Sequence, residues 1–134
     1  MMGEKIGDET SKMISQRVIS VEGGLPTLEN SSKGTGTLLG VQYQSQATYT
    51  GKLRPDGTLF GEGQGLLMGK GGENATWVGQ AVGKVTQNGG VSWRGSFIFQ
   101  TTHAKWARLN TICVPFEYEI DANGDGKGHM HEWR

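Results

Sequence analysis

Glycine occupies alternate positions in the segment from Thr58 to Met68, where Gly61, Gly63 and Gly65 interleave with larger side chains. Successive side chains of a β-strand point to opposite faces, so these glycines share one face of the strand. A strand that coils tightly, or that lies under a neighbour's aromatic ring, needs side chains missing from one face. A small closed barrel imposes both demands, so the pattern favours a barrel over a flat sandwich.

Composition supports an ordered, compact chain. Glycine accounts for 23 of the 134 residues, well above the usual share of about 7%. Four Trp, four Phe and three Tyr argue against disorder, and the absence of a three-residue glycine repeat excludes collagen. The length suits one domain with a real core.

Alternating segments separated by turn signals follow one another along the chain. Asn88-Gly89-Gly90 predicts a hairpin turn, and Pro55-Asp56-Gly57 predicts a second tight turn. No alternation of strands with helical segments is present. We therefore predict an all-β, Gly-rich, antiparallel up-and-down barrel of about eight strands. The strands with the clearest alternation are Gly34–Leu39, Val41–Leu53, Thr58–Met68, Ala75–Thr86 and Val91–Thr101.

The ends of the chain are less regular. Residues 1–12 are predicted to be a flexible leader, and residues 13–134 the barrel domain. A first strand is expected from Met13 to Val21, and Glu29–Lys33 is expected to be a polar loop or a short helical turn. The remaining strands are expected at Trp106–Val114, Phe116–Ile120 and His129–Trp133.

Polar residues interrupt several apolar strand faces. Such a face is either the wall of an apolar cavity with a few convergent polar groups, or an outer face in water. The first interpretation predicts a ligand site inside the barrel. Its candidate residues are Phe60, Glu62, Gln64, Leu66, Trp106, Arg108, Asn110 and Tyr118.

Three functions fit these observations. The favoured one is binding of a small apolar or amphipathic molecule in a cavity on the order of several hundred Å³. An isomerase or cyclase is the second, with Glu62 or Tyr118 as the titrating group. The third is a structural homo-oligomer, since Ile98 lies opposite Trp93 on a strand that is apolar on both faces.

A calcium-loop pattern lies near the C-terminus, where Asp121, Asn123, Asp125 and Glu132 stand at the spacing of oxygen ligands. A helix-loop-helix calcium site needs a helix on each side, and the preceding segment is typical of a strand. Asp, Asn and Gly also form ordinary hairpin turns. We favour the turn and retain Ca²⁺ as the alternative.

Other chemistry finds little support. His129 and His131 share a strand face, but a transition-metal site needs further ligands. Lys+Arg and Asp+Glu balance at 13 each, so no global charge attracts nucleic acid or a membrane surface. No phosphate loop or nucleophile motif occurs, and Cys113 lies in an apolar run. No signal peptide or apolar span is evident, which favours a cytoplasmic location.

The segment from Gly34 to Trp133 resembles a group of small bacterial proteins that share a domain of unknown function. They are similar to the calycin-like barrels of the allene oxide cyclases. The motifs that carry the resemblance are Gly61-Glu-Gly-Gln-Gly65, Asn88-Gly-Gly-Val-Ser-Trp-Arg-Gly-Ser-Phe97, Phe116-Glu-Tyr-Glu-Ile120 and Glu132-Trp133. The resemblance implies a barrel, and for the cyclases a fatty-acid epoxide substrate and a trimer. Its motifs mark strands and turns, so no catalytic residue carries over.

Overall fold

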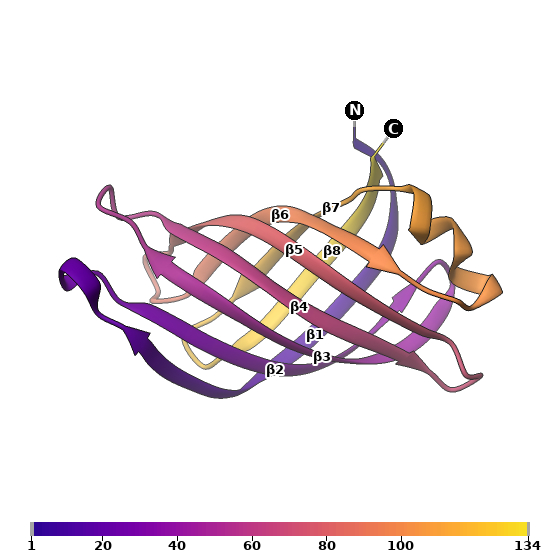
Figure 1. The fold of residues 1–134 in the computed structure, drawn as a ribbon, viewed down its shortest axis with the longest axis horizontal. Helices are drawn as coiled ribbons and strands as arrows, with labels where there is room; N and C mark the ends of the chain where they lie inside the picture. The colour runs from indigo at the N-terminus through magenta and orange to yellow at the C-terminus, as the bar shows by residue number, and fades with distance from the viewer. Residues whose placement is uncertain (1, 134) are drawn as a thin grey trace.

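The computed structural model describes residues 2–133, which form a closed barrel of eight antiparallel strands (Figure 1). Each strand pairs with the next along the chain, and β8 pairs with β1 to close the sheet. This confirms the predicted fold class. The strands are β1 (Met2–Ser20), β2 (Thr27–Leu38), β3 (Val41–Leu53), β4 (Leu59–Gly69), β5 (Asn74–Val85), β6 (Val91–Gln100), β7 (Val114–Ile120) and β8 (Asp125–Trp133).

The N-terminal segment differs from the expected flexible leader. Residues 2–12 belong to β1, and residues 7–12 pair with strands on both sides, as Asp8 shows by pairing with Thr37 of β2 and His129 of β8. The segment lacks apolar alternation because Glu9 and Ser11 face the barrel interior. Without this strand the sheet would not close.

The start of β2 also lies in a segment that we expected to be a loop. Residues 29–33 are paired throughout with β1 and β3. Asn30 is buried on the inner face, where its Oδ1 accepts a hydrogen bond of 2.8 Å from Gln16 Nε2. A polar sequence forms a strand here because the inner face of the barrel is itself partly polar.

A 3₁₀-helix, η2 (Ala104–Thr111), replaces the strand expected at Trp106–Val114. Trp106 and Leu109 are three residues apart, which is one turn of a 3₁₀-helix, and both are fully buried. Trp106 Nε1 donates a 2.9 Å hydrogen bond to the carbonyl oxygen of Leu38. The helix lies at the barrel end near both chain termini (Figure 1) and packs into the apolar core there.

Aromatic rings occupy the space that the alternating glycines leave. A Cβ atom built on Gly61 or Gly83 would lie 2.7 Å or 2.8 Å from the ring of Trp93. One on Gly126 would lie 2.5 Å from the ring of Tyr118. Real Cβ atoms do not approach so closely, so the glycines are needed for these rings to lie against the sheet. The barrel is therefore largely filled rather than hollow.

The outer face carries a small apolar group. Val78 of β5 pairs with Ile98 of β6, and both side chains are more than half exposed. Ile98 thus lies on the outer face, opposite the inward Trp93, as the strand pattern indicated. Association of copies through this face stays a prediction. Within residues 2–133, no helix has the length and apolar character that crossing a membrane requires.

Substitution of glycine by alanine under Trp93 tests the role of the glycines. Gly61→Ala should destabilise the barrel by about 1–3 kcal/mol, because the added methyl group overpacks the indole ring. Gly51→Ala is the matched control, since its Cβ would meet the same ring at an ordinary 3.7 Å. Urea denaturation followed by tryptophan fluorescence measures both variants. Equal stabilities would show that Trp93 adjusts freely and that the contact is unimportant.

Candidate ligand site in the barrel interior

A cavity of about 90 Å³ lies inside the barrel. It reaches Gly124 in the β7–β8 turn, at the end opposite η2. Most of its wall is apolar and aromatic, and polar residues from several strands complete it. Glu62 and Gln80 border the cavity, although both residues are exposed on the outside of the barrel. The aromatic lining residues are Tyr49, Trp77, Trp93, Phe97, Phe116 and Tyr118; the polar and small residues include Glu9, Ser11, Ser32, Ala47 and Ala81.

The cavity is smaller than the several hundred Å³ that the ligand hypothesis predicts. The rings pack against one another as well as against glycines. Phe97 and Phe116 stack with their centroids 4.1 Å apart, and Trp77 lies 4.5 Å from Phe97. Tyr49 meets Trp93 edge-to-face at 6.1 Å. These contacts use most of the interior volume, so the remaining space suits only a small molecule.

Glu9 is the centre of a polar cluster beside the cavity. Its Oε1 accepts a hydrogen bond of 3.1 Å from the Tyr43 hydroxyl, and its Oε2 accepts one of 2.7 Å from the Tyr118 hydroxyl. The Tyr118 hydroxyl also bonds to Ser11. Glu9 lies deep in the barrel yet keeps some exposure, because it borders the cavity. Two tyrosine hydroxyls thus contact the carboxyl directly and Ser11 joins them through Tyr118, so the cluster draws on β1, β3 and β7.

Burial controls the acid–base properties of this cluster. It raises the pKa of Glu9, although hydrogen bonds from Tyr118, Ser45 and Tyr43 oppose the shift. The pKa values of Tyr43 and Tyr118 are also raised, first by burial and then by the neighbouring Glu9 charge. Burial alone raises the pKa of Tyr49 to about 12. The tyrosines therefore stay protonated and serve as hydrogen-bond donors, while Glu9 is a carboxyl with a raised pKa.

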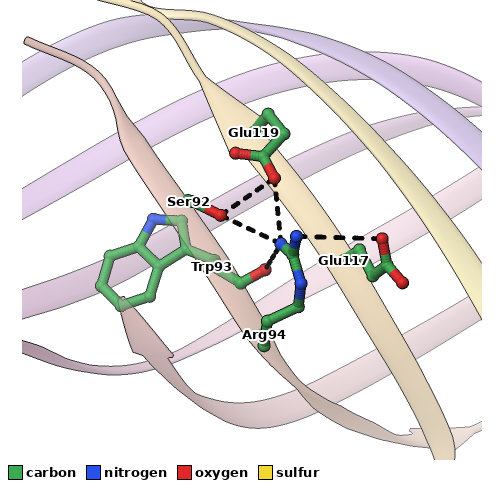
Figure 2. Close-up of polar contacts among 5 residues, drawn as sticks. All are labelled: Ser92, Trp93, Arg94, Glu117 and Glu119. Atoms are coloured by element: carbon green, nitrogen blue, oxygen red, sulfur yellow. Dashed lines mark hydrogen bonds and ion pairs between the residues drawn. The ribbon is translucent and has the colours of Figure 1, made fainter. Parts of the chain in front are cut away.

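Charged side chains lie on the outer wall. Figure 2 shows Arg94 between Glu117 and Glu119, with the side chain of Trp93 directed away from this group. Arg94 Nη1 lies 3.0 Å from a carboxylate oxygen of Glu119 and donates a 2.9 Å hydrogen bond to the backbone carbonyl of Trp93. The exposed guanidinium is thus engaged outside the barrel, next to the residue whose ring lines the cavity.

The structure reverses the expected orientation of β4. The glycine face points inward, where Gly61 and Gly65 receive the rings of Trp93 and Trp77. The opposite face, which we expected to line the cavity, lies outside. Its candidate residues are Phe60, which is half-buried, and Glu62, Gln64 and Leu66, which are exposed. Because these rings pack against the glycines, the glycine face of β4 is inside the barrel and the face with the larger side chains is outside.

Three other candidates gather at the η2 end rather than in the cavity. Trp106 belongs to the apolar core. Arg108 forms an ion pair with Glu132 of β8. The Asn110 side chain accepts a 2.8 Å hydrogen bond from Thr101 N and donates a 3.0 Å bond to Thr101 O. These residues anchor the 3₁₀-helix to the barrel. Of the candidates named from sequence, Tyr118 alone presents its side-chain hydroxyl to the interior cluster.

The residues of the calcium pattern form a hairpin turn between β7 and β8. Asp121 Oδ1 accepts hydrogen bonds from the backbone N–H groups of Asn123 at 2.9 Å and Asp125 at 3.0 Å. Asp125 lies 3.6 Å from Lys12, and Glu132 pairs with Arg108 elsewhere. Across residues 2–133, no three His, Cys, Asp or Glu residues gather in a group that could hold a metal.

The histidine pair meets other partners. His129 Nδ1 lies 2.6 Å from Asp8 Oδ1 across the β8–β1 seam, and His131 Nδ1 lies 3.2 Å from the carbonyl oxygen of Gly3. The hydrogen bond with His129 is the main cause that lowers the pKa of Asp8. These contacts tie the last strand to the first.

Sequence reasoning missed Glu9, Ser11 and Tyr43. The first two lay in the expected leader, and Tyr43 had no recognisable partner in the sequence. One signal was present: Glu9, Ser11 and Met13 have the alternate spacing of one strand face, beside a polar opposite face. That pattern predicts a strand only if polar side chains are accepted on the inner face of a barrel.

Comparison with known proteins shows that the chain is similar in fold to several solved structures. No family model matches the sequence, and no curated protein matches it. A Clostridium acetobutylicum protein of unknown function superposes with a TM-score of 0.84 at 10% identity, covering 98% of each chain. A beta-barrel-like protein from Acinetobacter baumannii gives 0.83 at 8% identity, covering 100% of this chain and 96% of the other. An enzyme from Penicillium herquei gives 0.69 at 12%, covering 96% and 92%.

Denaturation at several pH values tests the environment of Glu9. A carboxyl whose pKa is raised on folding stabilises the fold below its unfolded pKa, and this stabilisation is lost as pH rises through the folded pKa. Wild type should therefore lose stability relative to Glu9→Gln as pH rises from about 4.5. Urea midpoints between pH 4 and 8 measure the difference. A constant difference would place Glu9 in a water-like environment.

Proposed function

We propose that the protein binds a small amphipathic molecule inside the barrel. The observation that carries the proposal is the cavity itself, which has aromatic walls and one polar corner formed by Glu9, Ser11 and Tyr118. Aromatic walls favour an apolar body, and a few convergent polar groups orient a ligand through its polar end. The cavity volume limits the ligand to a few heavy atoms.

The position of the polar corner supports binding more than a purely structural role. A polar cluster that only stabilised the barrel would be expected within the packed core, away from any space. Glu9 instead borders the cavity, with its carboxyl oxygens held by Tyr43 and Tyr118. Fixed donors and acceptors beside an open space are preorganised for a ligand, because they lose little freedom when it binds.

An isomerase or cyclase is a second proposal, of the type that the resemblance to allene oxide cyclases implies. Glu62 lies outside, whereas Tyr118 lies inside, 2.7 Å from Glu9. A carboxyl with a raised pKa and an adjacent hydroxyl donor can move a proton on a bound carbonyl compound. The similarly folded Penicillium herquei protein is an enzyme, although a likeness at this identity concerns the fold alone.

A cavity-filling variant tests ligand binding. Ala47→Leu should remove binding of small amphipathic probes such as butan-1-ol, n-butylamine and p-cresol, because Ala47 lines the cavity. Gln46→Leu places the same side chain on the exposed face of the same strand and should leave binding unchanged. Probe-induced shifts of the Trp77 and Trp93 indole N–H signals in NMR spectra report binding. Wild type that shows no shift at millimolar probe would refute the proposal.

Solvent deuterium exchange tests the enzyme proposal. In D₂O the wild type should speed replacement of the α-protons of butan-2-one, with Glu9 removing the proton and Tyr118 donating to the carbonyl oxygen. Glu9→Gln should lose this rate, and Tyr118→Phe should lower it, while Glu4→Gln on the exposed face of β1 should not. Proton NMR follows the exchange. A wild-type rate equal to that of Glu9→Gln would contradict proton transfer by Glu9.

A further inference from the structure

The cavity holds an acidic group but no basic one. Glu9 is the carboxyl whose side chain joins the interior hydrogen-bond cluster, and no Lys, Arg or His is found among the described residues that line the cavity. The groups that face Glu9 are hydroxyls: Tyr43 and Ser45 from β3, Tyr118 from β7 and Ser11 from β1. When Glu9 is ionised, hydroxyl dipoles alone therefore compensate its charge inside the barrel.

Basic side chains near the cavity wall are engaged outside the barrel. Arg94 contacts Glu119 at 3.0 Å, Lys12 contacts Asp125 at 3.6 Å, and Lys5 contacts Asp8 at 3.0 Å. Each of these pairs is about half exposed to water or more. The sheet thus separates an outer layer of paired charges from an unpaired negative charge within.

The aromatic walls favour a positively charged ligand. The cavity is lined by Tyr49, Trp77, Trp93, Phe97 and Phe116. Aromatic faces carry negative potential and attract ammonium groups, most strongly when water is excluded. A buried carboxylate and several rings around one small space together suit an organic cation. An anionic ligand would meet the Glu9 charge and the same ring faces without any compensating group.

We infer that the ligand of this cavity is a small organic cation, an amine or quaternary ammonium with a short apolar body. Its charged end lies at Glu9 and its apolar end among the rings of Trp77, Trp93 and Phe97. This inference rests on the proposed function, because it names the ligand class of the same cavity. It also explains the cost of a buried carboxyl, since a bound cation would supply the missing counter-charge.

Three probes of matched shape test the charge of the ligand. n-Butylammonium, butan-1-ol and butanoate share an apolar chain and differ in charge. At pH 7.5, wild type should bind n-butylammonium about tenfold more tightly than butan-1-ol, and butanoate more weakly than either. NMR shifts of the Trp77 and Trp93 indole groups give the dissociation constants.

Glu9→Gln removes the carboxylate charge and keeps the shape of the cavity. The variant should lose most of the preference for n-butylammonium over butan-1-ol, because the carboxylate charge is removed and only the weaker attraction of the ring faces remains. Glu4→Gln, the same change on the exposed face of β1, should bind as wild type does. The indole spectra of each variant in the absence of probe report whether it is folded.

The pH dependence of wild type provides a second measurement without a variant. Affinity for n-butylammonium should rise with pH as Glu9 ionises, since the amine itself stays protonated to about pH 10. Tyr43 and Tyr118, the other titrating groups that face Glu9, keep their protons over this range.

The outcomes distinguish the two proposals. Equal binding of butan-1-ol and n-butylammonium, unchanged by Glu9→Gln, would overturn the cation inference and leave amphipathic binding intact. Affinity for n-butylammonium that falls as pH rises would do the same, because ionised Glu9 would then not favour a cation. If none of the three probes shifts the Trp77 and Trp93 signals, both proposals fail.

Discussion

The packing of aromatic rings against glycines is the contact on which the rest of the barrel depends. Trp93 lies over Gly61 and Gly83, and Tyr118 lies over Gly126 and Gly128. Each ring fills the space left by glycines on the strand beside it, and Trp93 also reaches Gly61 two strands away. A Cβ at these glycines would push the ring toward the cavity, so the same contacts fix the fold and the shape of the site.

The polar cluster at Glu9 is the main departure from an apolar barrel interior. Its hydroxyl partners come from β1, β3 and β7, so it forms only after β1 closes the sheet against β8. Burying a carboxyl costs free energy even when hydroxyls satisfy it. The proposed binding role would offset this cost, because a bound ligand could satisfy the carboxyl further.

The sequence predicted the strands of the barrel better than the side chains that lie inside it. Alternation and the Asn88-Gly89-Gly90 turn predicted β5 and β6 closely, because cross-strand pairing depends on local pattern. Glu9 and Ser11 were not identified, since a polar inner face resembles an exposed segment. The orientation of β4 was also reversed. Alternation separates two faces of a strand, but it does not say which face a neighbour's ring will cover.

By itself, the sequence determined the class of fold. Period-two alternation with glycines every second residue permits little besides a tightly coiled, closed β-sheet. Only the tertiary structure decided what lies inside. Trp93 covers Gly61 two strands away in the sheet, and Glu9 meets Tyr118 across 109 residues. The physical reason is that pairing along a strand is local, whereas the filling of a barrel depends on side chains that meet only after the sheet has closed.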